Sequence, residues 1–197
     1  MTPLDLRGCV FAPVIRLPAD YEVYDFTGGY DPGRRLASPY GVGRYDEKRR
    51  GMYTTELFAG GRDVHVGVDL GAPVGEAVHA FFDGTVHRFA YNAAPGDYGH
   101  TLVTQHALNG RLVWALHGHL AARSLEGRYE GQPVARGEVI AWVGDRHENG
   151  GWNPHLHFQL SLVCPEVADL PGAVSDADRA QALALYPDPR LVLGPIY

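Results

Sequence analysis

The stretch VHVGVDL, residues 64–70, opens a series of short runs rich in β-branched and aromatic residues, and this series decides the fold. Between about residues 63 and 162 the runs recur roughly every ten residues, with Gly, Pro, Asn or Asp between them. They are VHVGVDL (64–70), AVHAFF (77–82), GTVHRFAY (84–91), HTLVTQH (100–106), RLVWALHGHL (111–120), EVIAWVG (138–144) and HLHFQLSL (155–162). The pattern predicts a mainly β, mostly antiparallel architecture, either a sandwich or an open barrel.

The segments on either side of this core follow different patterns. Residues 1–60 are rich in Gly, Pro, Tyr and Arg and lack a helical period, which predicts an irregular N-terminal extension packed on a core at 61–163. Residues 164–197 form a C-terminal tail with one short helix over SDADRAQALAL (175–185), with Ser175 or Asp176 as N-cap. No repeat or linker divides the chain, so 1–197 is expected to be a single domain.

Composition excludes several classes of protein. With 197 residues, 45% hydrophobic and 20% charged, the chain can bury a core and fold alone as a monomer. A net charge of −6 without a basic stripe argues against nucleic acid as a partner. No run approaches the roughly 20 apolar residues of a membrane span, and the N-terminus does not resemble a signal peptide. We therefore expect a cytoplasmic protein without membrane contact, unless the natural chain has further residues upstream.

The ten histidines lie between positions 65 and 157, which indicates a metal site. His65 and Asp69 share one face of a strand, but an extended strand would hold their Cα atoms about 13 Å apart, too far for one ion. Gly67 lies between them, and a bend there costs little, so the imidazole and the carboxylate can converge. The sequence thus predicts two metal ligands on either side of a glycine bend.

Two further histidine pairs complete the pattern. His155 and His157 are two residues apart, about 6.6 Å along a strand, so one can bind a metal while the other faces the open coordination position. His117 and His119 repeat this spacing, and His119 would face His155 if the two strands are neighbours. Two histidines and one carboxylate form a recurrent catalytic zinc set, with a fourth position for water. The remaining imidazoles would move protons or stabilise an oxyanion.

The same residues resemble a known family. The runs HVGVD, GDYGHTLVTQH, HGHL, GQPVARGEVIAWVG and PHLHFQ, over about residues 63–160, are similar to the lysostaphin-type, LytM-like zinc metalloendopeptidases, which cut peptide cross-bridges of peptidoglycan. The resemblance implies an antiparallel β-sheet folded into a sandwich-like groove and one Zn²⁺ per chain. It implies His65, Asp69 and His157 as zinc ligands and His119 and His155 as the catalytic pair.

A finer resemblance concerns GVGRYDE, NAAPGDYG, GDRHENGGWNPHLHFQ and YPDPRLVLG. These segments look like a subgroup found in multidomain proteins beside kinase-like and class III aminotransferase domains. The chain differs from exported wall hydrolases at His117, where they usually carry an aromatic residue. It differs also at GGWNP (150–154), where they usually carry a Ser/Thr-Gly-rich loop. The differences leave the substrate open.

Several residues are candidates for substrate contact: His117, Arg44, Tyr45, Trp152 and Asn153. The charged run 44–50 is otherwise read as a solvated face, and His106 as structural. The leading hypothesis is a zinc peptidase or amidase acting on a peptide or peptidoglycan-like substrate. Its alternatives are a metal-containing module that binds a peptide or small ligand without turnover, and a cytoplasmic hydrolase of a substrate outside the cell wall.

Overall fold

The computed structural model describes residues 4–31, 33 and 37–197. Its largest element is an eight-stranded sheet, in the order β1-β2-β5-β12-β9-β8-β7-β10. Its strands are β1 (Glu22–Val23), β2 (Gly41–Gly43), β5 (Val68–Gly71), β12 (His155–Ser161), β9 (Arg111–Leu120), β8 (Gly99–Leu108), β7 (Gly84–Asn92) and β10 (Pro133–Val134). All neighbours are antiparallel except β1 and β2. The predicted mainly β, antiparallel fold is confirmed.

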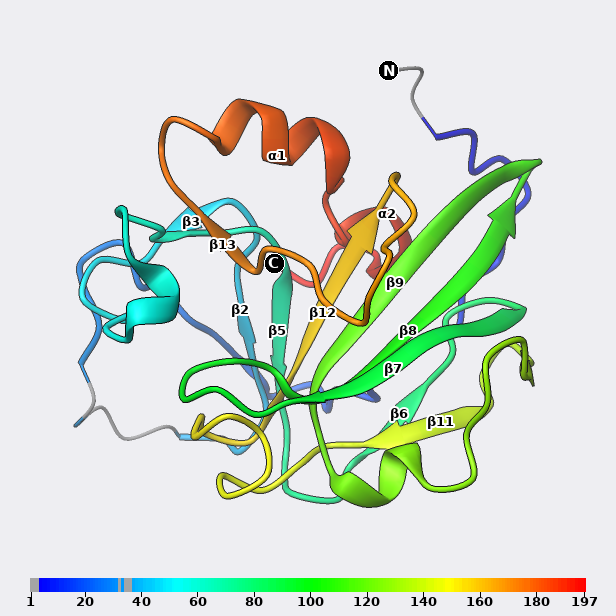
Figure 1. Ribbon diagram of the computed structural model, residues 1–197, viewed down its shortest axis with the longest axis horizontal. Coiled ribbons are helices and arrows are strands. Elements are labelled where there is room, and N and C mark those ends of the chain that lie inside the picture. The colour runs from blue at the N-terminus through cyan, green and yellow to red at the C-terminus, as the bar shows by residue number, and fades with distance from the viewer. Residues whose placement is uncertain (1–3, 32, 34–36) are drawn as a thin grey trace.

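Two smaller sheets complete the described part of the fold. One pairs β6 (Ala77–His79) with β11 (Val139–Trp142), and Figure 1 shows this pair below the long strands β7, β8 and β9. The other has the order β13-β4-β3, from Ala173–Val174, Val64–His65 and Glu47–Lys48. Short 3-10 helices occupy Glu56–Phe58 (η1) and Ala122–Leu125 (η2).

The hydrophobic core forms because alternate residues of the long strands face opposite sides of the large sheet. Leu102 and Phe158 on one side pack with Val78 and Ile140 of the β6–β11 pair, and all four are fully buried. On the other side, strand residues pack against the C-terminal tail in a second cluster, made of Tyr98, Val103, Trp114, Leu116, Ala168 and Leu170. The apolar runs quoted above therefore fill both faces of the sheet.

The flanking segments differ from the sequence prediction in two ways. The N-terminal region is not purely irregular, because it contributes β1, β2 and β3, and β2 pairs with β5 inside the large sheet. These strands have two or three residues, too few for an alternating pattern to reveal them.

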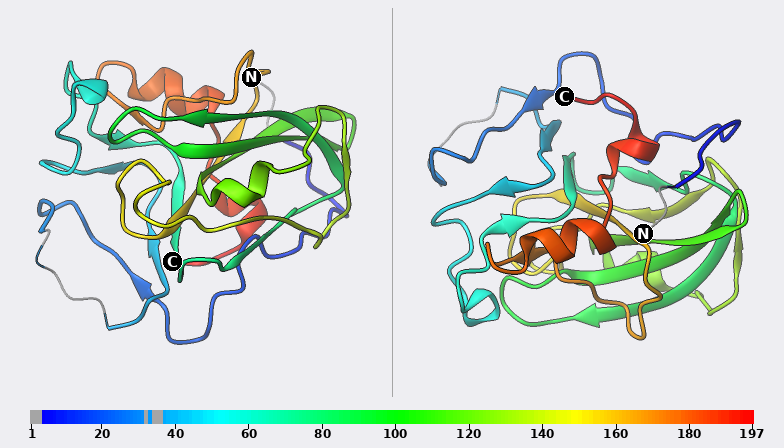
Figure 2. Two further views of the ribbon diagram at one scale, coloured as in Figure 1. Left: turned by 60° about the horizontal axis from the view of Figure 1, so that its bottom comes forward. Right: turned by 90° about the horizontal axis from the view of Figure 1, so that it is seen from above.

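At the C-terminus α1 spans Arg179–Leu185, and a four-residue helix α2, Arg190–Leu193, follows it. Ser175 Oγ contacts the Asp178 side chain and backbone ahead of α1, so the helix starts later than predicted. The view from above in Figure 2 shows α1 in front of the sheets, where Ala182 packs on Val64, Val66 and Val174. Within the described residues no helix is long and apolar enough to cross a membrane.

Candidate metal centre

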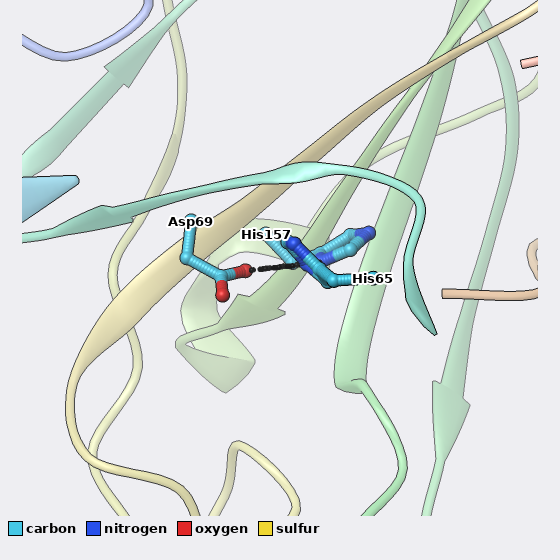
Figure 3. Close-up of side chains that lie close together, drawn as sticks. All are labelled: His65, Asp69 and His157. Atoms are coloured by element: carbon cyan, nitrogen blue, oxygen red, sulfur yellow. Dashed lines mark hydrogen bonds and ion pairs between the residues drawn. The ribbon is translucent and has the colours of Figure 1, made fainter. Parts of the chain in front are cut away.

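His65, Asp69 and His157 come from three strands and meet at one point. β4 carries His65 and β5 carries Asp69 in different sheets, because the chain leaves one sheet and enters the other at Val66 and Gly67. β12 pairs with β5 so that His157 lies directly opposite Asp69, and cross-strand partners share a face. One ligand atom from each of the three lies within 4.8 Å of the others. Figure 3 shows the carboxylate of Asp69 directed at the two imidazoles.

Gly67 provides both the bend and the space for this arrangement. A Cβ at this position would lie 2.4 Å from Cε1 and 2.5 Å from Nε2 of His157, closer than real Cβ atoms approach. The predicted glycine bend between His65 and Asp69 is therefore confirmed, and the structure adds a second reason for the glycine.

Hydrogen bonds outside the centre fix which nitrogen of each ligand histidine faces inward. His65 Nδ1 donates to the carbonyl of Arg44 at 2.9 Å, and His157 Nε2 donates to Oε1 of Gln159 at 3.0 Å. The lone pairs of His65 Nε2 and His157 Nδ1 therefore point inward, 3.2 and 3.1 Å from Oδ1 of Asp69. Hydrogen-bond acceptors such as the Arg44 carbonyl and Gln159 Oε1 are the kind of partner that orients histidines as metal ligands.

The protonation states at neutral pH suit a cation. Burial lowers the pKa of His65 to about 4, helped by the positive charge of Arg49. Burial alone would raise the pKa of Asp69, but the neighbouring His65, the positive charge of Arg49 and the contact with His157 outweigh it and hold that pKa well below its usual range. The donors are therefore an Asp69 carboxylate and, at His65, a neutral imidazole. With the inward-facing Nδ1 of His157 they form a set that fits a divalent cation such as zinc.

His119 and His155 lie together beside this centre. Their ring centroids are 4.3 Å apart, since β9 pairs with β12 as the sequence analysis required. Nδ1 of His119 donates to the Asn149 carbonyl at 2.8 Å, and Nδ1 of His155 donates to the Asn153 carbonyl at 2.6 Å. Both Nε2 atoms are thus left as acceptors. Burial lowers the pKa of both residues, with smaller contributions from neighbouring charges, so both are neutral at pH 7.

His119 reaches this position through an irregular backbone. His117 pairs with Leu102 of β8, and Leu120 pairs with His100. Between these two pairs β9 advances by three residues and β8 by only two, so β9 has a bulge of one residue. His119 itself has a φ of 63°, in the left-handed region that non-glycine residues rarely adopt. Backbone strain of this kind is concentrated at functional sites. Its effect here is to turn the side chain toward His155.

His117, a candidate for substrate contact, lies outside the lining of the groove. Its side chain is fully buried, Nδ1 contacts the Leu102 carbonyl at 3.2 Å, and the ring packs against Phe158 with centroids 5.4 Å apart. Because the register shifts between His117 and Leu120, the spacing of two between His117 and His119 does not place them on one face. His117 is a core residue, and burial lowers its pKa to about 3.

The other candidates for substrate contact divide into two groups. Trp152 and Asn153 line a groove of about 440 Å³ over the metal centre. Arg44 and Tyr45 lie outside its lining, because the Arg44 side chain binds Glu47 and Asp25 and the Tyr45 hydroxyl donates to the Tyr186 carbonyl. Arg44 acts instead through its backbone carbonyl, which receives the His65 hydrogen bond.

Two residues at the centre were missed in the sequence. Arg49 donates from Nη1 to Oδ2 of Asp69 at 2.6 Å, although the run 44–50 was read as a solvated face. Tyr98 is buried between His119 and His157, with ring centroids 5.5 and 5.1 Å away, and its hydroxyl donates to the Leu170 carbonyl at 3.0 Å. One signal was readable: Glu47 and Arg49 are two apart, so on a strand they face the same side.

A β-sheet groove with a two-histidine, one-carboxylate set and two further neutral histidines is an arrangement that suits metal-dependent hydrolysis. The chain belongs to Peptidase family M23, which matches residues 63–168. It is 33% identical over 164 residues to the DD-carboxypeptidase/endopeptidase Mpg of Neisseria meningitidis serogroup B, covering 77% of this chain and 33% of that protein. It is also 33% identical over 138 residues to an uncharacterized metalloprotease of Haemophilus influenzae, covering 66% of this chain and 27% of that protein. The chain thus spans about a third of the length of such curated relatives.

Solved structures of similar proteins were also found. The antimicrobial peptidase lysostaphin from Staphylococcus simulans aligns with a TM-score of 0.49 and 20% identity, over 80% of this chain and 53% of that one. A zinc containing peptidase from Vibrio cholerae aligns with a TM-score of 0.43 and 25% identity, over 64% of this chain and 33% of that one.

Proposed function

We propose that this chain is a zinc-dependent peptidase that hydrolyses an amide bond in a peptidoglycan-type or related peptide. The observation that carries the proposal is the geometry of five residues: three ligands that converge on one point and two neutral histidines beside it. Relatives named as DD-carboxypeptidase/endopeptidase support a peptide substrate. We also infer membership of the multidomain subgroup, for which the segments GVGRYDE and GDRHENGGWNP are the support.

The chain's own residues can perform the proton transfers of amide hydrolysis. Zinc held by His65, Asp69 and His157 would polarise the scissile carbonyl and acidify a water molecule. His155 is placed to accept the proton of the attacking water, because its Nε2 lies 3.7 Å from Oδ1 of Asp69 and is unprotonated at pH 7.

His119, beside His155, can take part in the same way: its unprotonated Nε2 can accept a proton from the attacking water. The imidazolium so formed can donate a hydrogen bond to the oxyanion or pass that proton to the leaving amine. The walls of the groove shield both groups from bulk water: only 17% of the His155 side chain and 14% of the Asp69 side chain are exposed. Trp152, anchored by its Nε1–H to the Gly96 carbonyl at 3.1 Å, forms one wall and is placed to pack against the substrate.

Metal analysis and hydrolysis assays test the proposal together. Purified wild type should contain one zinc per chain, and His65→Ala and His157→Ala should lose it. His155→Ala should retain the metal, because His155 is not one of the three ligands, but it should lose hydrolysis of peptidoglycan fragments. His147→Ala is the matched control, because the His147 side chain is 77% exposed and lies outside the groove lining.

Two results would count against the proposal. Absence of metal after zinc is supplied would leave a scaffold without a catalytic centre. Zinc-loaded wild type that captures peptidoglycan peptides but cleaves none, nor any glycine-rich peptide or small amide, would favour the binding module considered in the sequence analysis.

A further inference from the structure

One arginine, Arg49, is buried beside the ligand set and donates hydrogen bonds to oxygen atoms of four different residues. Only 2% of the Arg49 side chain is exposed, and arginine is almost never buried to this extent unless it is paired. Its Nη1 donates to Oδ2 of Asp69 at 2.6 Å and to the Tyr53 hydroxyl at 3.2 Å. Its Nε donates to Oε2 of Glu47 at 3.1 Å, and Nη2 donates to the Arg44 carbonyl at 3.3 Å. The guanidinium therefore has a partner on every side.

These contacts connect Arg49 to two of the three ligands. Asp69 is held directly, and its two oxygens are divided: Oδ2 faces Arg49, while Oδ1 faces the imidazoles of His65 and His157. His65 is held indirectly, because its Nδ1–H and Nη2 of Arg49 donate to the same carbonyl, that of Arg44. A single side chain thus fixes the orientation of both a carboxylate ligand and an imidazole ligand.

The local fold is arranged to keep this arginine in place. β3 pairs with β4 so that Glu47 lies opposite His65, and Arg49 follows directly after β3. On β2, Gly43 lies opposite Asp69, and a Cβ there would come 2.7 Å from Nη2 of Arg49 and 3.1 Å from Oδ2 of Asp69. Glu47, with 2% of its side chain exposed, supplies the negative charge that compensates Arg49, so Asp69 does not have to neutralise it alone.

We propose that Arg49 is a positioning residue of the metal centre: it occupies one oxygen of Asp69 and thereby presents the other as a single donor atom to zinc. The proposal rests on the metal site of the proposed function, and it adds a residue that the ligand motif does not contain. Lysine cannot replace this arginine, because an ammonium lacks the planar fork that reaches Glu47, Asp69 and the Arg44 carbonyl together. Partners that orient metal ligands typically change metal affinity about 10- to 100-fold when they are removed.

The test measures metal binding rather than peptidase activity. Metal-free wild type, Arg49→Met and Arg49→Lys are titrated with Zn²⁺ in competition with a chelator, and with Co²⁺ while its visible absorption bands are recorded. We expect about 10- to 100-fold weaker Zn²⁺ binding in both variants and a changed Co²⁺ spectrum, because Asp69 is free to rotate. Arg179→Met is the matched control: Arg179 makes a two-pronged pair with Asp46, at 2.7 and 2.9 Å, without touching a ligand. It should bind both metals as wild type does.

Folded Arg49→Met with wild-type Zn²⁺ affinity and Co²⁺ spectrum would overturn the proposal. If Arg49→Met does not fold, Arg49→Lys decides, because it keeps the buried positive charge beside Glu47 and Asp69. Wild-type affinity in that variant overturns the proposal, and at least tenfold weaker binding supports it. If wild type itself binds no zinc, the proposed function fails first. If wild type binds zinc but cleaves nothing, the proposed function fails, and the positioning role is still decided by the ratio of Zn²⁺ affinities of wild type and the Arg49 variants.

Discussion

Replacement of Gly67 by alanine should damage the metal centre by displacing one imidazole. The added Cβ would lie 2.4 Å from Cε1 of His157, whereas ordinary contacts begin at 3.4 Å, so the ring has to move by about 1 Å. His157 cannot yield easily, since it is buried and bound to Gln159, with the Tyr98 ring beside it. Forcing extra atoms into such a packed site costs about 1–3 kcal/mol.

The two effects of this substitution are measured separately. Urea unfolding of the metal-free protein should show the loss of about 1–3 kcal/mol, which lowers Tm by about 2–4 °C per kcal/mol in a chain of this size. Zinc affinity should fall at least tenfold, because Nδ1 of His157 no longer faces Oδ1 of Asp69.

Gly28→Ala provides the matched control. Nothing lies within 4 Å of a Cβ at Gly28, so this change reports only the entropy effect of replacing glycine with alanine, typically about 0.4–1 kcal/mol in favour of the folded state. If Gly67→Ala equals Gly28→Ala in both unfolding free energy and zinc affinity, close packing against His157 is not what requires the glycine.

Three further predictions concern the surroundings of the centre. Gln159→Leu removes the acceptor of the His157 hydrogen bond and should weaken zinc binding about 10- to 100-fold; unchanged affinity in a competition titration would refute this role. Saturating zinc should raise Tm of wild type but not of His65→Ala, because the ion binds only the folded chain; equal shifts in both would place the binding elsewhere. Burial lowers the pKa of His106 to about 4 and of His117 to about 3, so the unfolded chain binds more protons below pH 6.5 and stability falls there. Each should cost about 2 kcal/mol between pH 7 and pH 5 in urea unfolding; equal stability at the two values would contradict their burial as neutral groups.

The ligand set could be predicted because it follows from short-range rules. The spacing of His65 and Asp69 around a glycine needs only strand geometry and the freedom of a residue without a Cβ. The alternation of His155 and His157 likewise places both on one face, and the structure brings both to the same groove. Their roles as catalyst and ligand stay predictions, supported by the resemblance and by the hydrogen bonds that orient each ring.

The positions that could not be predicted depend on departures from regular structure or on distant partners. A period of two treats His117 and His119 alike, but the bulge and the positive φ at His119 separate them. Gly118 between them is a hint, since an isolated glycine in a strand suggests a bulge, but it does not show where the extra residue falls. The run 44–50 looks solvated because it is charged. Only the pairing of β3 with β4 shows that Glu47 and Arg49 point inward while Lys48 reaches the surface and binds Asp176.

The position of β2 in the large sheet has a consequence for how this module could be exchanged between proteins. The family match begins at residue 63, yet β5, which carries Asp69, is hydrogen-bonded on one side to β2. A graft cut at the match boundary would leave the backbone N–H and C=O groups of Val68–Gly71 unpaired along an open edge, where another chain can add as a strand. It would also lose Arg49. The smallest transplantable unit of this protein therefore begins before Gly41, and the family match is shorter than the piece of chain that the candidate metal centre needs.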